Sequence, residues 1–115
     1  MELQLSSTKI FVSNNPVDFR KGIDGLSEYV TTVYASSPLD GLYVFYNKGK
    51  DKLKILFWHN NGFVLIQKRL EKNRFIINPS ENIVEIDNKQ LSWLLAGLDW
   101  STMSDWKELS YNDYY

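Results

Sequence analysis

The chain contains no cysteine and only three prolines. Without a thiol it cannot form a disulfide scaffold, a zinc ribbon built on cysteine or a cysteine nucleophile. It also lacks a long apolar run, and its first thirty residues show no basic start followed by an apolar stretch. This pattern predicts a cytoplasmic protein without a membrane span or a signal peptide.

The 115 residues suffice for one globular domain and are too few for two. We expect a single α+β domain over residues 1–100, followed by an aromatic and acidic tail over residues 101–115. Aromatic residues make up 15% of the chain, with four tryptophans and seven tyrosines. This is more than a small core requires, so some of the rings are expected to meet a partner.

Charge is distributed unevenly along the chain, although the formal net charge is only -1. Residues 47–74 carry eight basic and two acidic groups, whereas residues 75–115 carry two basic and seven acidic groups. The middle of the chain is therefore strongly basic and its end strongly acidic.

Hydrophobic periodicity and turn residues predict two helices and a sheet. The first expected helix covers residues 16–35, with Pro16 at the first helical position. The second begins with a capping box at Asp87 and Gln90 and ends at Gly97. The expected strands cover residues 10–12, 42–46, 52–59 and 63–70, with shorter ones near 74–76 and 83–86. These elements predict an antiparallel β-meander sheet packed on one face by the N-terminal and the C-terminal amphipathic helix.

The pair Asn61-Gly62 predicts a two-residue hairpin turn, because both residues tolerate a positive φ. In that register Trp58 opposes Leu65, Leu56 opposes Gln67 and Lys54 opposes Arg69. One face of the hairpin is then apolar core. The other face is expected to lie open and to be basic and aromatic.

No constellation of residues typical of a catalytic centre is found in the chain. The single histidine, His59, has no partner that the sequence identifies. Asp18 and Asp24 lie six residues apart on the expected helix, about 240° around its axis, so they cannot share a metal ion. Phosphate-binding, HExxH and GxSxG motifs are absent. We therefore expect no catalytic residue, metal or cofactor.

The basic middle of the chain is the stronger functional signal. Cations that alternate with aromatic and amide side chains are typical of a surface that follows phosphates and stacks bases. The candidate nucleic-acid-binding residues are Lys48, Lys50, Lys52, Lys54, Trp58, Gln67, Arg69, Lys72 and Arg74. Two alternatives stay open: the lysines only solubilise the sheet, or the acidic end of the chain covers them in the same or a second copy.

Several motifs occur together in a fixed order. Residues 18–26 spell D-x-R-K-x-x-D-G-L, and the later matches are residues 51–56, Trp58, Gly62-Phe63, 68–71, Arg74-Phe75 and Asp99-Trp100. With these motifs the chain resembles the TnpB-type (Orf2-like) accessory proteins of the sixty-sixth insertion-sequence family, which are encoded beside a bacterial transposase.

The resemblance implies a non-catalytic helper of transposition and carries over no catalytic residue. Its implied partner is the transposase of the same element, with DNA as a further candidate. An alternative hypothesis, suggested by the near-neutral total charge and the excess of aromatic residues, is an adapter that binds the transposase without touching DNA. Its candidate contacts are Arg20, Lys21, Trp100, Trp106 and Tyr111. The chain departs from the family pattern at His59 and at Ile66-Gln67, where a carboxylate and aromatic residues are usual.

Overall fold

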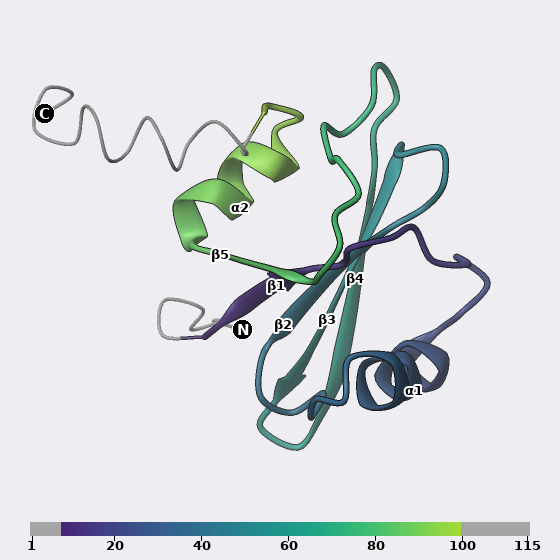
Figure 1. The fold of residues 1–115 in the computed structure, drawn as a ribbon, viewed down its shortest axis with the longest axis vertical. Helices are drawn as coiled ribbons and strands as arrows, with labels where there is room; N and C mark the ends of the chain where they lie inside the picture. Colours follow the sequence, from purple (N-terminus) through teal and green to yellow (C-terminus); the bar gives the residue numbers. More distant parts are fainter. Residues whose placement is uncertain (1–7, 100–115) are drawn as a thin grey trace, which may run out of the picture.

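A computed structural model describes residues 8–99 of the chain. It consists of β1 (Ile10–Val12), α1 (Ile23–Val33), β2 (Leu42–Tyr46), β3 (Lys52–His59), β4 (Gly62–Arg69), β5 (Val84–Ile86) and α2 (Asn88–Leu95). The strands form one sheet in the order β4-β3-β2-β1-β5 (Figure 1). Neither helix in this part of the chain is long and apolar enough to cross a membrane.

The sheet is mixed, which corrects the expected antiparallel meander. β2, β3 and β4 follow one another as antiparallel neighbours. β1, however, pairs parallel with β2, Ile10 lying opposite Leu42, and β5 pairs antiparallel with β1. A parallel neighbour requires a crossover connection, and here the segment that contains α1 provides it. The α+β class is therefore confirmed, while the topology differs in two pairings: β1 runs parallel to β2, and β5 pairs with β1 instead of following β4.

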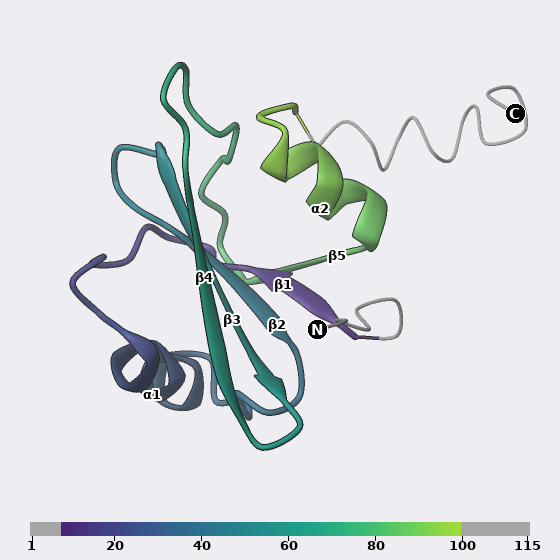
Figure 2. The ribbon, with the colours of Figure 1, turned by 180° about the vertical axis from the view of Figure 1, so that it is seen from behind.

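The two helices cover opposite faces of the sheet (Figures 1 and 2), so the expectation that both pack on one face is wrong. Leu26 and Val30 of α1 pack with a cluster on one face, which we call the α1 face; it includes Tyr43, Phe45 and Leu56. α2 packs on the other face, the α2 face. β2 is buried at every residue, because its side chains meet a core on both sides.

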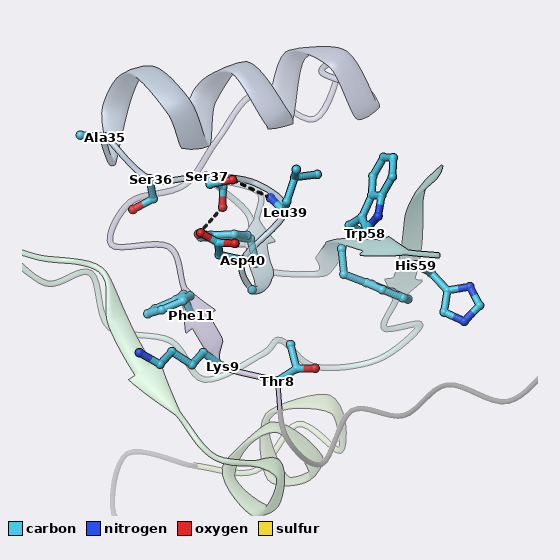
Figure 3. Close-up of a pocket in the computed structure, with 13 residues that line it drawn as sticks. Thr8, Lys9, Phe11, Ala35, Ser36, Ser37, Leu39, Asp40, Trp58 and His59 are labelled. Carbon is cyan, nitrogen blue, oxygen red and sulfur yellow. Dashed lines mark hydrogen bonds between the residues drawn. The ribbon is translucent and has the colours of Figure 1, made fainter. Parts of the chain in front are cut away.

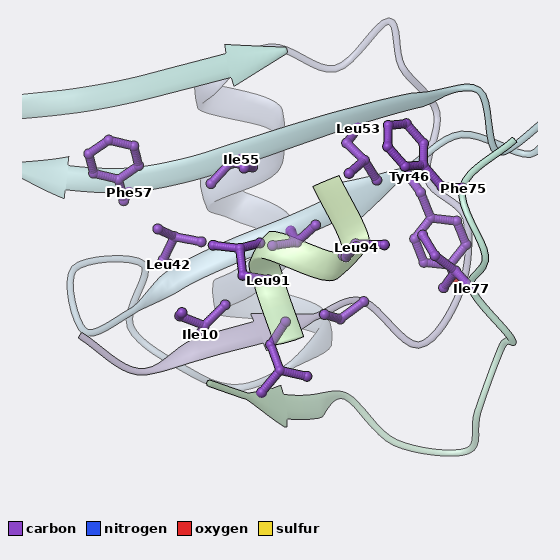
Figure 4. Close-up of a cluster of buried hydrophobic side chains, with 13 residues drawn as sticks. Ile10, Leu42, Tyr46, Leu53, Ile55, Phe57, Phe75, Ile77, Leu91 and Leu94 are labelled. Carbon is purple, nitrogen blue, oxygen red and sulfur yellow. The ribbon is translucent and has the colours of Figure 1, made fainter. Parts of the chain in front are cut away.

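The larger core lies on the α2 face (Figure 4). Leu91 and Leu94 of α2 contribute to it, and Phe75 and Ile77 reach it from the segment after β4. That segment has no strand pairing, although a strand was expected near residues 74–76. Burial of its alternate apolar residues holds it in place instead.

α1 begins at Ile23, seven residues later than its predicted start at Pro16. Residues 16–22 form a loop in which Val17 N–H donates to Tyr46 O at 2.9 Å, and Asp18 Oδ1 accepts from Arg20 N–H at 2.9 Å. The loop's polar groups are thus bonded to the sheet and to each other. At α2 the predicted capping box is confirmed: Asp87 Oδ1 accepts from Gln90 N–H, and Gln90 Oε1 accepts from Asp87 N–H.

The hairpin between β3 and β4 has its two-residue loop at Asn60-Asn61, with Asn60 at φ 56°. Relative to the predicted Asn61-Gly62 turn, the register moves by two residues. Trp58 opposes Phe63, and Lys54 opposes Gln67. A shift of two keeps every side chain on its predicted face, so only the partners change.

Candidate nucleic-acid interface

The turn between β2 and β3, residues 47–51, is held by the side chain of Asn47. Its Oδ1 accepts from the N–H groups of Asp51 and Lys52, both at 3.1 Å, and its Nδ2 donates to Asp51 Oδ1 at 2.7 Å. Lys50 adopts a left-handed φ of 59° and donates its N–H to Asn47 O. These bonds fix the backbone, so that Lys48 and Lys50 project from a defined turn.

The segment after β4 is bonded to this turn. Leu70 N–H donates to Asp51 O and Phe75 N–H to Lys50 O, both at 2.8 Å. The guanidinium of Arg74 donates from Nη1 to Gly49 O at 3.0 Å. Residues 47–51 and 70–75 therefore form one structural unit at this end of the sheet.

Lys54 attaches the loop before α1 to the same end. It lies on the α1 face, and its Nζ donates to Phe19 O and to Lys21 O, each at 2.8 Å. The same Nζ lies 4.9 Å from the centre of the Phe19 ring. Only 8% of the residue is exposed. The prediction that Lys54 lies on an open face is therefore wrong, because the side chain is buried and its ammonium donates to two backbone carbonyls of the same chain.

Three loops thus meet at the end of the sheet where β2 ends and β3 begins. We call this region the basic end: residues 16–22, 47–54 and 69–75. It holds nine basic and three acidic side chains, an excess of six positive charges. The basic members are Arg20, Lys21, Lys48, Lys50, Lys52, Lys54, Arg69, Lys72 and Arg74.

The cations of the basic end differ in how they are used. Arg20 forms an ion pair with Asp18 at 2.8 Å, and Arg69 with Glu71 at 2.9 Å. Within residues 8–99 no salt bridge or side-chain hydrogen bond engages the ammonium groups of five lysines of the basic end: Lys21, Lys48, Lys50, Lys52 and Lys72. These five are the charges that remain available to an anionic partner.

Two carboxylates of the basic end are held in their charged form. Hydrogen bonds from Arg20 lower the pKa of Asp18 to about 2. The hydrogen bond from the Asn47 side chain lowers the pKa of Asp51. Both groups are ionised at neutral pH, so they reduce the local positive charge and organise the loops.

Trp58 lies at the opposite end of β3, six residues from Lys52, which is about 20 Å along a strand. Its ring meets Phe63 edge-on with centroids 5.1 Å apart, and the residue is 40% exposed. Gln67 is exposed on β4 opposite Lys54. The structure therefore separates the tryptophan from the cations that the sequence placed beside it.

Trp58 borders an open groove of about 840 Å³ that the sequence did not predict (Figure 3). Phe11 and Tyr43 stack with centroids 5.3 Å apart in its wall, and the residues between α1 and β2 form its rim. In that rim Tyr43 Oη donates to Ser37 O at 3.2 Å. The only early sign of such a site is the excess of aromatic residues.

The part of the chain that the structure describes contains no group of three or more His, Cys, Asp or Glu residues placed to hold a metal ion. His59 borders the groove beside Trp58. The partner-binding candidates Trp100, Trp106 and Tyr111, and the tail over residues 101–115, lie outside the described residues.

Comparison with known proteins gives one family. The model described as IS66 Orf2-like protein matches residues 8–105. Uncharacterized protein y4jC of Sinorhizobium fredii is 36% identical over 95 residues, covering 81% of either chain. Uncharacterized protein y4hO of the same organism is 33% identical over 96 residues, covering 82% of this chain and 84% of the relative. No solved structure matches the chain significantly.

Proposed function

Because the chain belongs to the IS66 Orf2-like protein family, we propose that it is a non-catalytic accessory factor for transposition of a bacterial insertion sequence and contacts DNA through the basic end. The family matches residues 8–105 and links the chain to an insertion sequence.

One observation carries the DNA contact: five lysines without an internal side-chain partner in the described part of the chain project from the basic end, whose loops are bonded to the sheet and to one another. A group of fixed cations attracts phosphates and releases the counterions bound to them, which makes binding strongly dependent on salt. Because the contacts are to phosphate, the binding they support depends little on base sequence. Arg74, whose guanidinium donates to the neutral carbonyl of Gly49, adds its charge to the field around these lysines, whereas Arg20 and Arg69 are largely neutralised by Asp18 and Glu71.

The test is the salt dependence of binding to a labelled duplex, measured by fluorescence anisotropy with terminal sequences of the element and with random DNA. Lys48→Gln, Lys50→Gln and Lys72→Gln are each expected to lower the slope of log affinity against log salt by about 0.9. Lys9→Gln is the matched control, because Lys9 is exposed and lines the groove at the other end. Absence of binding at low salt, or equal slopes for all four variants, would refute the proposal.

A second candidate function is an adapter that binds the transposase without touching DNA. The open groove with its exposed Trp58 favours it, since aromatic side chains dominate protein interfaces. Arg20, Lys21, Trp100, Trp106 and Tyr111 remain candidate contacts for that partner.

Co-purification with the element's transposase after nuclease treatment separates the two functions. An adapter retains its partner, and Trp58→Ala weakens the capture while Ile76→Ala, at a residue of similar exposure outside the groove, does not. Loss of the transposase on nuclease treatment would instead show that DNA bridges the two proteins.

A further inference from the structure

β4 is the outermost strand of the sheet on the side away from β5. All eight of its residues, from Gly62 to Arg69, pair with β3 in an unbroken register, without a bulge or a proline. No described segment pairs with its other edge. Long, regular edges of this kind invite a further strand, and proteins normally protect them.

The register shows which backbone groups face outward. Leu70 N–H donates to Asp51 O, just beyond the last strand pair. In the same register the even-numbered residues of β4 are the ones whose N–H and C=O groups bond to β3. In an antiparallel pair the intervening residues turn their N–H and C=O groups away. The outward groups of β4 therefore belong to Phe63, Leu65, Gln67 and Arg69.

The usual protection of an edge by charge is weak here. The Lys68 ammonium donates to Leu95 O at 2.7 Å, and Arg69 is paired with Glu71 at 2.9 Å. Both cations are thereby held by groups of the same chain. The other half of the strand, Phe63 to Ile66, is apolar, and Ile66 is 42% exposed.

A small apolar hollow of about 270 Å³ adjoins this edge on the α2 face. Ile55, Phe57, Ile66 and Leu95 contribute to its lining, and Lys68 is its only charged residue. An apolar side chain beside Ile66 would extend over this hollow and lose its contact with water.

We propose that β4 pairs antiparallel with β4 of a second copy of this chain, with Ile66 on the two-fold axis, and joins the two sheets into one. In this register Leu65 opposes Gln67 of the second copy, and Phe63 opposes Arg69 of the second copy. The outward N–H and C=O groups of both strands then meet in about eight hydrogen bonds.

A second copy fits because the strand is complementary to itself in length and charge. One half carries Lys68 and Arg69, and the other half is uncharged. Antiparallel pairing places the cationic half of each copy beside the uncharged half of the other, so like charges are not opposed. A two-fold axis through Ile66 also places the two most exposed apolar side chains of the edge against each other.

Single cysteines provide the first test, because the chain has none of its own. Ile66 would form a non-hydrogen-bonded pair with its copy, at a Cα separation of about 4.5 Å that suits a disulfide. Under mild oxidation I66C is expected to form a cross-linked dimer at least ten times faster than I76C. Ile76 is the matched control, being 41% exposed and outside β4. Equal rates would overturn the proposal.

Sedimentation of the full chain provides the second test and requires no DNA, so its result is independent of the proposed function. At about 100 µM the wild-type chain and I76K are expected to sediment as dimers of twice 13.5 kDa. I66K should sediment as a folded monomer, because two ammonium groups would meet on the axis. A monomeric wild-type chain would overturn the proposal.

Discussion

The two ends of the sheet are built differently. At the basic end three loops are joined by backbone hydrogen bonds and by the buried Lys54 ammonium. At the other end the loop before β2 and the last residues of β3, Phe57 to His59, border an open groove of about 840 Å³. The basic end therefore shows that the cations of one charged segment have two roles. Some, such as Lys54 and Arg74, hold the loops by hydrogen bonds, and the lysines unpaired within residues 8–99 stay free to bind an anionic partner.

The largest expected effect is the loss of the Lys54 ammonium. Lys54→Met keeps most of the side-chain stem but leaves Phe19 O and Lys21 O without their donor. We expect the free energy of unfolding to fall by about 1 to 3 kcal/mol, since two partly buried carbonyls would lose a hydrogen bond from a charged donor. Urea denaturation measures it.

Lys52→Met is the control for this prediction. Lys52 lies two residues before Lys54 on β3, on the same face of the sheet, but its ammonium has no side-chain partner within residues 8–99. Its effect should stay within about 0.5 kcal/mol. Equal destabilisation by the two substitutions would show that the Lys54 bonds do not hold the loop.

An intermediate effect distinguishes the turns at the two ends. Asn47→Ala removes three hydrogen bonds within residues 47–52 and should cost about 1 to 2 kcal/mol of unfolding free energy. Asn61→Ala at the groove end should cost less than about 0.5 kcal/mol, because no side-chain hydrogen bond of Asn61 is present within the described residues. Thermal unfolding of both variants gives the difference, and a larger loss for Asn61→Ala would contradict it.

The smallest effect concerns acid. The pKa of Asp18 is lowered to about 2 by Arg20, whereas an aspartate in an unfolded chain titrates near pH 3.9. A lowered pKa in the folded state stabilises the protein above about pH 4, and this contribution is lost as the pH falls toward 2. Asp51, whose pKa is also lowered, acts in the same direction.

Asp18→Asn is therefore expected to reduce the fall in stability between pH 5 and pH 3, measured by urea denaturation at each pH. Arg20→Gln removes the partner of the same carboxylate and should reduce the fall in the same way. A wild-type slope in both variants would show that this ion pair does not contribute.

The sequence predicted helices and strands well where their signal, such as alternating apolar residues or a capping residue, lies within the element itself. β1, β2 and β3 have their predicted bounds, and the capping box of α2 is present. The sequence also carries a local sign of the two-sided architecture. Leu42–Tyr46 is a continuous apolar run, typical of a strand covered on both faces, and the helices do lie on both.

Other errors came from contacts between distant residues. The start of α1 moved because residues 16–22 bond to β2 and to Lys54, and no local pattern reveals those partners. Lys54 stands between the apolar residues Leu53 and Ile55, a pattern typical of an exposed lysine on a strand. The loop 16–22 covers it in the folded protein, and its ammonium holds that loop through two hydrogen bonds. Trp58 shares a strand with Lys52 and Lys54, but β3 is eight residues long, so the tryptophan lies at the end of the sheet away from the cations.

The amino-acid order alone determined the helix and strand periodicities, the excess of positive charge in residues 47–74 and the family motifs, because each depends on residues near one another in the chain. Tertiary structure decided which strand runs parallel, which face each helix covers and which lysines remain unpaired. Those outcomes depend on contacts between residues far apart in the chain, such as the hydrogen bond from Lys54 to Phe19, which lie 35 positions apart.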